Sequence, residues 1–577
     1  MLTTLPLEVF SIITDELTKP DLESLSLVSR RTRELTTRAL WQSVTLRLVS
    51  DHKLHCVRPA RVPHECYEFT TEFHLRSDFV ELLTKRCPHV YYDPPRPNDI
   101  EPSDTDSEDD DESIGLPCFD RLGERLESVL RRFRDGQLRS FSWDLAVCVP
   151  SAILGSRGIV SLRQSSRLRS LYLKTNPTCY EGRGDDCEID LSPFRQLRSL
   201  TWKAPTARNL ETLSVALRSN ATHLQEFDLD LADWGSLKER LKIGNDQANS
   251  YFSKTVLGLD GRFTAPYFQD IRILSLSRVA ITASMVPLIN FSTLVSLTLR
   301  QCPGWVEFLH RIGRQKYSIR LKRLEIQGLL SDHPTTGQEV GLFIRTFKGL
   351  EELFRLWDYA SLHRATLKKF VYHLRARDRT RGFALFDNLK DSKDLAILPN
   401  RMRDIMKNPA RRGPFAKLSV ECIGLSCALE QLKTILQPFR SKRSLKLLHI
   451  RQSRRDMHCC GSIALETRVL KGIGMFGSKS DSEELEQREV WRGLQREFRC
   501  FLEWAYGPTG LPSLQVIAFG DFSINDPWSK CNVIVCKDKD KRTKCRVLNP
   551  SEPKAKRIFS EFRNVLEACP VEPILDG

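Results

Sequence analysis

Few residue patterns in the sequence could carry out chemistry, and the first of them is rich in glycine. Gly472-x-Gly474-x-x-Gly477 matches the dinucleotide-binding fingerprint letter by letter. The acids that follow, between Asp481 and Glu484, would repel a phosphate at a helix N-terminus, and no βαβ unit surrounds the motif. We therefore interpret this segment as a loop that holds no cofactor.

Cysteine and histidine form two loose clusters that could suggest a metal. His458-Cys459-Cys460 and Cys531-x4-Cys536-x8-Cys545 lack the paired CxxC spacing of a structural zinc site. His64-Glu65-Cys66 lacks the downstream cysteine pair of zinc deaminases, and the sequence has neither a GxSxG elbow nor an HExxH helix. These patterns predict no metal, no cofactor and no catalytic residue, so we expect binding rather than catalysis.

Residues that could bind a partner are spaced along a recurring strand pattern. The fragment LxxLxL, with conservative swaps, begins at positions 138, 168, 197, 224, 271, 294, 321, 445 and 514. Starts from 138 to 224, and from 271 to 321, fall 23 to 30 residues apart, which is close to the period of a leucine-rich repeat. Helical spacing fills the gaps, as at Leu210, Leu213 and Leu217. The period breaks at 230–270, 375–417 and 455–510, and a non-repetitive α/β domain with leucine-rich strands is the alternative.

In such a repeat the residues between the leucines face outward on the concave side, where partners bind. We predict that the substrate-binding residues are Tyr172, Lys174, Lys203, Thr298, Arg300, Glu325, His449 and Arg451. The basic members suit an acidic or phosphorylated partner, while solvated strand residues are the alternative interpretation. Asn176 and Cys302, three positions after the last leucine of their repeats, could satisfy backbone groups at the turn.

The stretch from Leu5 to Leu46 has apolar residues at helical spacing, with a second helix start at Pro20-Asp21. On a helical wheel, Val9, Phe10, Ile12, Ile13 and Leu17 span an arc of roughly 160°, and the apolar residues of the second helix, which include Leu27, span roughly 220°. An ordinary surface helix needs an apolar stripe of only about 100°. We therefore expect these helices to pack on two sides, one of them against a partner.

The same stretch resembles the F-box in both pattern and spacing. The match consists of Leu5-Pro6-x-Glu8-Val9, Ile13, Leu17, Asp21-Leu22, Leu25, Val28-Ser29-Arg30, Leu35 and Leu40-Trp41-x-x-Val44, and it departs at Thr32-Arg33, where the family often has an aromatic residue. The resemblance implies a three-helix hook that inserts into the Skp-family adaptor of a cullin-RING ubiquitin ligase. By the same resemblance the adaptor-binding residues are Leu5, Pro6, Val9, Ile13, Leu17, Leu22, Leu25, Val28 and Trp41. The alternative is that these are core residues of an N-terminal helical cap.

Composition limits the remaining possibilities for the 577 residues, which carry a net charge of +15. No run approaches 18 apolar residues, so we expect no membrane span, and seventeen scattered cysteines favour free thiols in a cytoplasmic or nuclear protein. Nine acids lie between Asp99 and Glu112, where Ser103, Thr105 and Ser107 resemble acid-directed kinase sites. The basic remainder raises a nucleic-acid alternative, but no nucleic-acid motif accompanies it.

The sequence therefore predicts an α/β protein, with an N-terminal three-helix F-box followed by an irregular leucine-rich-repeat solenoid. The expected division is 1–48 F-box, 49–92 connecting segment, 93–115 acidic disordered loop, 116–530 repeat domain and 531–577 C-terminal cap. The expected function is a non-catalytic substrate-recognition subunit of a Skp-cullin-F-box ubiquitin ligase, which holds an unknown protein substrate through its repeat surface. A non-ligase scaffold protein, or a basic nucleic-acid-associated protein, is the alternative.

Overall fold

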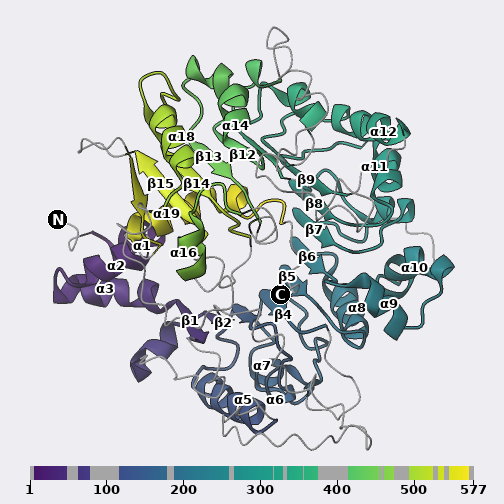
Figure 1. The fold of residues 1–577 in the computed structure, drawn as a ribbon. Helices are drawn as coiled ribbons and strands as arrows, with labels where there is room; N and C mark the ends of the chain where they lie inside the picture. The colour runs from purple at the N-terminus through teal and green to yellow at the C-terminus, as the bar shows by residue number, and fades with distance from the viewer. Residues whose placement is uncertain are drawn as a thin grey trace, which may run out of the picture. The chain divides into compact units, whose positions relative to one another are not determined.

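The structure is a computed structural model that describes much of the chain (Figure 1). The described residues are 5–17, 19–48, 63–77, 116–177, 187–258, 266–315, 317–328, 334–354, 357–373, 414–453, 457, 461–472, 493–523, 531–537, 545–550 and 552–570. They belong to two compact units, unit 1 (residues 1–290) and unit 2 (residues 291–576). This boundary falls inside the predicted repeat domain, whereas the acidic loop and its three kinase-like sites lie outside the described residues.

Unit 1 begins with three short helices, α1 (Leu7–Asp15), α2 (Lys19–Ser26) and α3 (Arg30–Trp41). Pro6 precedes α1, and Ser29 caps α3 through a reciprocal pair of bonds with Thr32. The Thr32 N–H donates to Ser29 Oγ over 3.1 Å, and the Ser29 N–H donates to Thr32 Oγ1 over 2.9 Å. Helices α1 and α2 both pack against α3, so the predicted order of three N-terminal helices is confirmed.

The sheet of unit 1 is parallel, and its strands follow one another in chain order. Its strands are β1 (Ser43–Leu48), β2 (Glu72–Ser77), β3 (Ser140–Asp144), β4 (Ser170–Lys174), β5 (Ser199–Lys203), β6 (Glu226–Asp230) and β7 (Ile273–Ser277). The register aligns Leu171 with Leu200 and Phe227, which stacks the repeat leucines into one core. The predicted alternation of strand and helix is confirmed here, and the architecture resembles a leucine-rich repeat.

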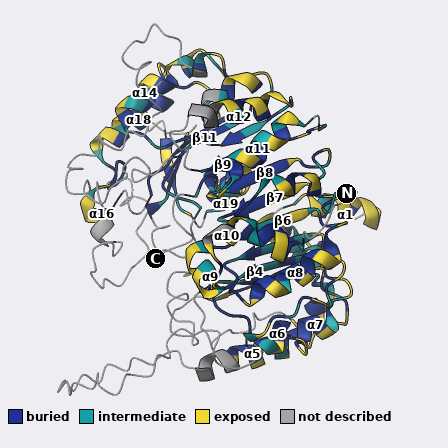
Figure 2. Cartoon of the chain, turned by 90° about the vertical axis from the view of Figure 1, so that its right-hand side faces the viewer, coloured by how far each residue is buried: buried dark blue, intermediate teal, exposed yellow. Residues whose placement is uncertain are grey.

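Helical segments connect these strands and cover the leucine face (Figure 2). They are η3 (His64–Phe69), α5 (Leu116–Leu130), α6 (Ser151–Leu154), α7 (Ile159–Arg163), α8 (Asn209–Asn220), α9 (Trp234–Arg240), α10 (Asn245–Tyr251), the π-helix η5 (Phe252–Val256) and η6 (Ala283–Leu288). The extra helices α9 and α10, together with η5, lie between β6 and β7. They account for the break that the repeat period shows at 230–270.

Buried polar side chains pin the loops between successive repeats. Asn220 accepts from the Leu197 N–H over 2.9 Å and donates to the Phe194 carbonyl over 2.7 Å. Gln164 makes the same kind of paired contact two repeats earlier, to the Leu138 N–H and the Arg134 carbonyl. These residues satisfy backbone groups that packing has removed from water. Gln164 and Asn220 therefore satisfy backbone groups before the strands, whereas Asn176 and Cys302 were predicted to do so after them.

The sheet of unit 2 starts in the same way and ends differently. Its parallel strands are β8 (Ser296–Arg300), β9 (Arg323–Gln327), β10 (Glu352–Phe354), β11 (Lys369–Tyr372), β12 (Cys422–Leu425), β13 (Leu447–Ile450) and β14 (Val516–Phe519). An antiparallel hairpin, β15 (Val533–Lys537) and β16 (Cys545–Leu548), closes the sheet. The helical segments are α11 (Trp305–Arg314), α12 (Pro334–Arg345), η7 (Trp357–His363), η11 (Pro414–Ala416), α14 (Leu429–Leu436), η12 (Gln437–Arg440), α16 (Thr467–Gly472), α18 (Arg496–Tyr506) and α19 (Pro553–Leu566).

Helix α19 covers the outward face of the unit 2 strands. Its residues Ile558, Phe562 and Val565 pack in one buried cluster with Val371 of β11 and Leu447 of β13. Every residue of β12, β13 and β14 is consequently buried, whereas β2, β4 and β5 of unit 1 alternate between buried and half-buried residues. Strands buried on both faces are apolar throughout, and strands with one open face alternate. Strands β12 to β14 are therefore covered on both faces, whereas β2, β4 and β5 keep one face partly open.

Candidate protein-interaction surfaces

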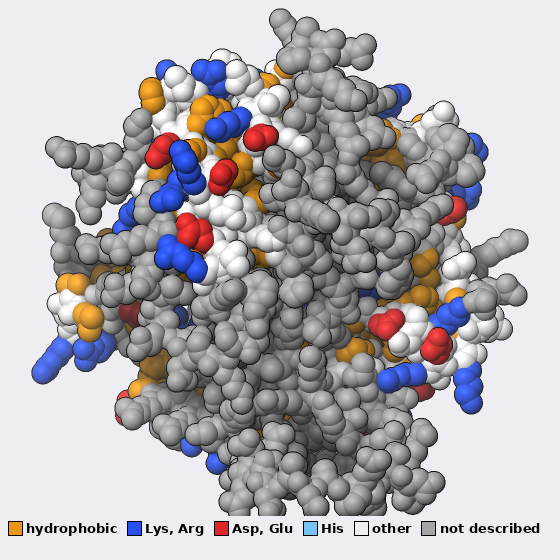
Figure 3. Space-filling model, viewed as in Figure 1, with side chains coloured by type: hydrophobic (Ala, Val, Ile, Leu, Met, Phe, Trp, Pro, Cys, Tyr) orange, Lys and Arg blue, Asp and Glu red, His pale blue; other side chains and the backbone are white. Residues whose placement is uncertain are grey.

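The three N-terminal helices leave large apolar side chains in solvent. The exposed fractions are 76% for Leu27, 73% for Val28, 66% for Ile12, 64% for Leu7 and 41% for Val9. We call these five residues the apolar N-terminal surface. Figure 3 shows hydrophobic side chains at the left edge of the molecule, where Figure 1 places α2 and α3. The interior of the hook is small and consists mainly of Phe10, Leu22 and three buried threonines.

The nine residues expected to bind the adaptor fall into three groups by exposure. Leu22 is buried, and Pro6, Val9 and Val28 are exposed. The half-buried residues are Leu5, Ile13, Leu17, Leu25 and Trp41. The family motif did not mark Leu7, Ile12 and Leu27 as binding residues, although the helical wheel had placed Ile12 and Leu27 in apolar arcs too wide for one buried face. Exposed apolar residues gathered in one short segment are typical of a protein-binding site.

A second candidate surface is the outward face of β2 to β5 in unit 1. The register places Arg76, Asp144, Lys174 and Lys203 side by side on adjacent strands, with Tyr172 on the same face two residues before Lys174. We call these five residues the unit 1 polar strip. Lys174 Nζ lies 3.8 Å from Asp144 Oδ1, and Lys203 Nζ lies 5.8 Å from the centre of the Tyr172 ring. Three predicted substrate-binding residues, Tyr172, Lys174 and Lys203, therefore lie together.

Electrostatics within the strip weaken the proton affinity of one lysine. Burial, together with the neighbouring cations Lys203 and Arg76, lowers the pKa of Lys174 to about 8, although Asp144 opposes the shift. The two lysines are direct register partners, and like charges in that position repel each other. Each lysine also lies near an acid: Lys174 lies beside Asp144, and Lys203 Nζ lies 3.8 Å from Asp228 Oδ2. The strip therefore combines the cations Arg76, Lys174 and Lys203 with Asp144 and the neighbouring Asp228, and it can contact a polar partner through these charges.

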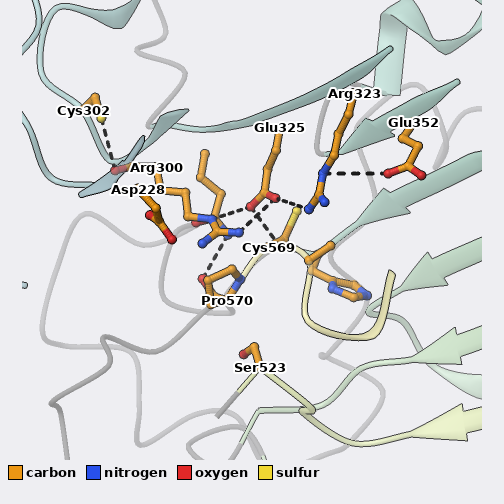
Figure 4. A network of polar contacts seen from close by, with 12 residues as sticks. Asp228, Arg300, Cys302, Arg323, Glu325, Glu352, Ser523, Cys569 and Pro570 are labelled. Atoms are coloured by element: carbon orange, nitrogen blue, oxygen red, sulfur yellow. Dashed lines mark hydrogen bonds and ion pairs between the residues drawn. The ribbon is translucent and has the colours of Figure 1, made fainter. Parts of the chain in front are cut away.

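The other five predicted substrate-binding residues belong to unit 2, where the expectation of an open face is wrong at four of them. Thr298, Glu325, His449 and Arg451 are buried, and Arg300 is half-buried. Arg300 donates to both carboxylate oxygens of Glu325, over 2.6 and 3.0 Å (Figure 4). Arg323 adds a third contact to Glu325, 3.7 Å from Nη2 to Oε2. At Glu325, His449 and Arg451 the physical reason for the burial is that α19 and the residues after it cover the strand face.

Buried charges of this face have perturbed pKa values. Burial alone would raise the pKa of the Glu325 carboxyl, but Arg300 and Arg323 outweigh burial and hold that pKa below its ordinary value. Burial lowers the pKa of His449 to about 4, and its Nε2 lies 2.9 Å from the Gly520 carbonyl oxygen. His449 is therefore a neutral residue of the interior at physiological pH.

The cysteine, histidine and glycine patterns of the sequence lie only partly within the described residues. Among residues that the structure describes, no three histidine, cysteine or acidic side chains gather where they could hold a metal ion. Burial raises the pKa of the Cys66 and Cys536 thiols, which makes them poor nucleophiles. Gly472 ends α16, while the rest of the glycine motif and the His458 cluster lie outside the described residues.

Comparison with known proteins leaves the family open. No family model matches the sequence, and no curated protein matches it. The fold defines the class: an α/β protein whose three N-terminal helices precede parallel strands that follow one another in chain order and alternate with helices, as in leucine-rich repeats. Within the described part of the chain, no helix combines the length and apolar character needed to cross a membrane.

Proposed function

We propose that this chain is a substrate-recognition subunit of a Skp-cullin-F-box ubiquitin ligase. Helices α1 to α3 dock on the Skp-family adaptor, and the unit 1 polar strip holds the protein client. The chain contributes no catalytic side chain. It raises the effective concentration of the client near the ubiquitin-charged enzyme that the rest of the assembly carries.

One observation supports the docking role above all others. The hook exposes five large apolar side chains within residues 7 to 28, and their burial needs a partner. The sequence resemblance to the F-box falls on the same segment, from Leu5 to Val44. A helical cap that served only this chain would turn such residues inward, because each buried leucine or valine contributes about 1.5–3 kcal/mol.

The assignment of the client to unit 1 rests on the contrast between the two strand faces. Helix α19 fills the outward face of β11 to β13, so the recognition residues predicted there are already engaged. The unit 1 polar strip keeps half-buried, charged side chains at Arg76, Asp144, Lys174 and Lys203. A strand face of this kind suits a partner with polar groups and charges of both signs.

Adaptor capture tests the proposal directly. The full chain would be expressed in cells with Leu27→Asp and Val28→Asp, and co-purified proteins would be quantified by mass spectrometry. Leu162→Asp is the matched control, because Leu162 is 67% exposed on α7 and lies outside the hook. We expect the double variant to lose the adaptor and the cullin together, while the control keeps both.

Two outcomes would contradict this assignment. If the double variant retains as much adaptor as the wild type, the hook is not the docking site. If the wild type captures the adaptor but no cullin, the non-ligase scaffold is the better description.

A further inference from the structure

A three-residue segment after α19 lies across the strand ends of unit 2, and we call Ala568–Pro570 the strap. Arg451 Nη1 donates to the carbonyl oxygens of Ala568 and Cys569, over 2.6 and 2.7 Å. The Cys569 N–H donates to Glu325 Oε1 over 3.1 Å, and Gln327 Nε2 donates to the Pro570 carbonyl over 3.0 Å. All four bonds reach backbone atoms of the strap. The polar side chains of unit 2 therefore hold the strap through its backbone.

The side chains that hold the strap are themselves held by other parts of unit 2. We call Arg300, Glu325, Gln327 and Arg451 the seat. Arg300 fixes the Glu325 carboxylate through two bonds (Figure 4). Arg451 also donates to Ser523 Oγ over 2.5 Å and forms an ion pair with Asp521. Charge-assisted and bidentate bonds of this kind fix geometry. Arg300, Glu325 and Arg451 are therefore held by contacts that do not involve the strap.

The strap fits the seat through small side chains and one unfavourable backbone conformation. Ala568 and Cys569 are almost fully buried, and their short side chains lie in the same apolar cluster as Val565 and Leu566 of α19. Cys569 has a φ of +53°, in the left-handed region that residues with a Cβ rarely adopt. The seat thus imposes the strap conformation.

We propose that the seat is a binding site for a short peptide segment, and that the strap is its resident intramolecular occupant. A peptide that binds the seat would present successive free carbonyl oxygens, one free N–H and small side chains. While the strap is in place, the seat is closed to such a partner, and displacement of the strap opens it. This inference goes beyond the proposed function, because it concerns unit 2 alone and requires no adaptor.

The test releases the strap without altering the seat. Cys569→Pro removes the N–H that bonds to Glu325, and a proline ring cannot adopt a φ of +53°. Cys569→Gly is the matched control, because glycine keeps the N–H and adopts positive φ freely. The probe is a fluorescein-labelled peptide of residues 566–573, under reducing conditions and with the full chain. Fluorescence polarisation should show saturable binding to Cys569→Pro, at least tenfold tighter than to the wild type or to Cys569→Gly.

The proposal is overturned if Cys569→Pro keeps the wild-type circular dichroism and cooperative melting but does not bind the peptide. Equal binding by wild type and Cys569→Pro would overturn it as well, since the seat would then not be closed by the strap. If Cys569→Pro fails to fold, Gln327→Ala takes its place; it shortens one side chain of the seat and removes the bond to Pro570, while Arg300, Glu325 and Arg451 stay unchanged. Amide hydrogen exchange at Cys569 should then be at least tenfold faster with excess peptide than without it, and unchanged exchange would refute displacement.

Discussion

Replacing Leu27 and Val28 together with alanine should weaken adaptor binding by about two orders of magnitude. The two side chains are 76% and 73% exposed, so about three-quarters of each is free for burial against a partner. Leu→Ala and Val→Ala together remove five carbon groups, each contributing about 0.8 kcal/mol when fully buried. Scaled to the free surface, the loss is about 3 kcal/mol, or about 150-fold in Kd.

Adaptor affinity would be measured by isothermal titration calorimetry, with the purified full chain and a Skp-family adaptor. Both residues lie between α2 and α3 and mostly in solvent, so the free energy of unfolding should change by no more than about 0.5 kcal/mol. Leu162→Ala removes a similarly exposed side chain from α7 and should leave the Kd unchanged. A loss smaller than about threefold in the double variant, with its fold intact, would refute the docking assignment.

Three further predictions concern the interior and the strand faces. Leu22→Ala should destabilise the hook by about 2–5 kcal/mol in denaturant unfolding, because Leu22 is buried between the N-terminal helices; a cost below about 1 kcal/mol would contradict this placement. Glu325→Gln should cost about 3–5 kcal/mol, since it removes the charge of the buried carboxylate that pairs with the half-buried Arg300 and Arg323. Glu351→Gln, at an exposed pair with Lys322 and Lys368, should cost less than about 1 kcal/mol, and equal costs would show that burial does not matter. The pKa of Lys174 falls from 10.5 in the unfolded chain to about 8 in the folded protein, so the unfolded chain binds more protons between these pH values. The free energy of unfolding should therefore rise with pH in this range, by up to about 3 kcal/mol more in the wild type than in Lys174→Met. Parallel curves of unfolding free energy against pH for the two proteins would exclude the shift.

Local periodicity predicted several of the strands and helices of unit 1. SLYLK and SLTWK alternate polar and apolar residues, and the strands β4 and β5 they form have one buried and one half-open face. The Ser29 break and the Pro20 start placed the N-terminal helices, because caps and proline act within one turn. Exposure of Leu27 and Val28 was also foreseeable, since the apolar arc was wider than one buried face.

Unit 2 shows where the same reasoning fails. The repeat rule predicted that Glu325 and Arg451 face solvent, yet they hold the backbone of residues more than a hundred positions away. A signal was present, because CIGL, LLHI and VIAF are apolar without alternation and therefore indicate strands covered on both faces. The sequence did not say which segment provides the cover.

The sequence by itself determined the order of helices and strands, the stacking of the repeat leucines and the surplus of apolar surface at the N-terminus. These features depend on spacing within a few residues, which fixes the direction of each side chain. Only the tertiary structure decided that α19 closes the outward face of unit 2 and that the strap occupies the seat. Such contacts join residues distant in the chain, and their free energy depends on complementary shape and charge that no local period encodes.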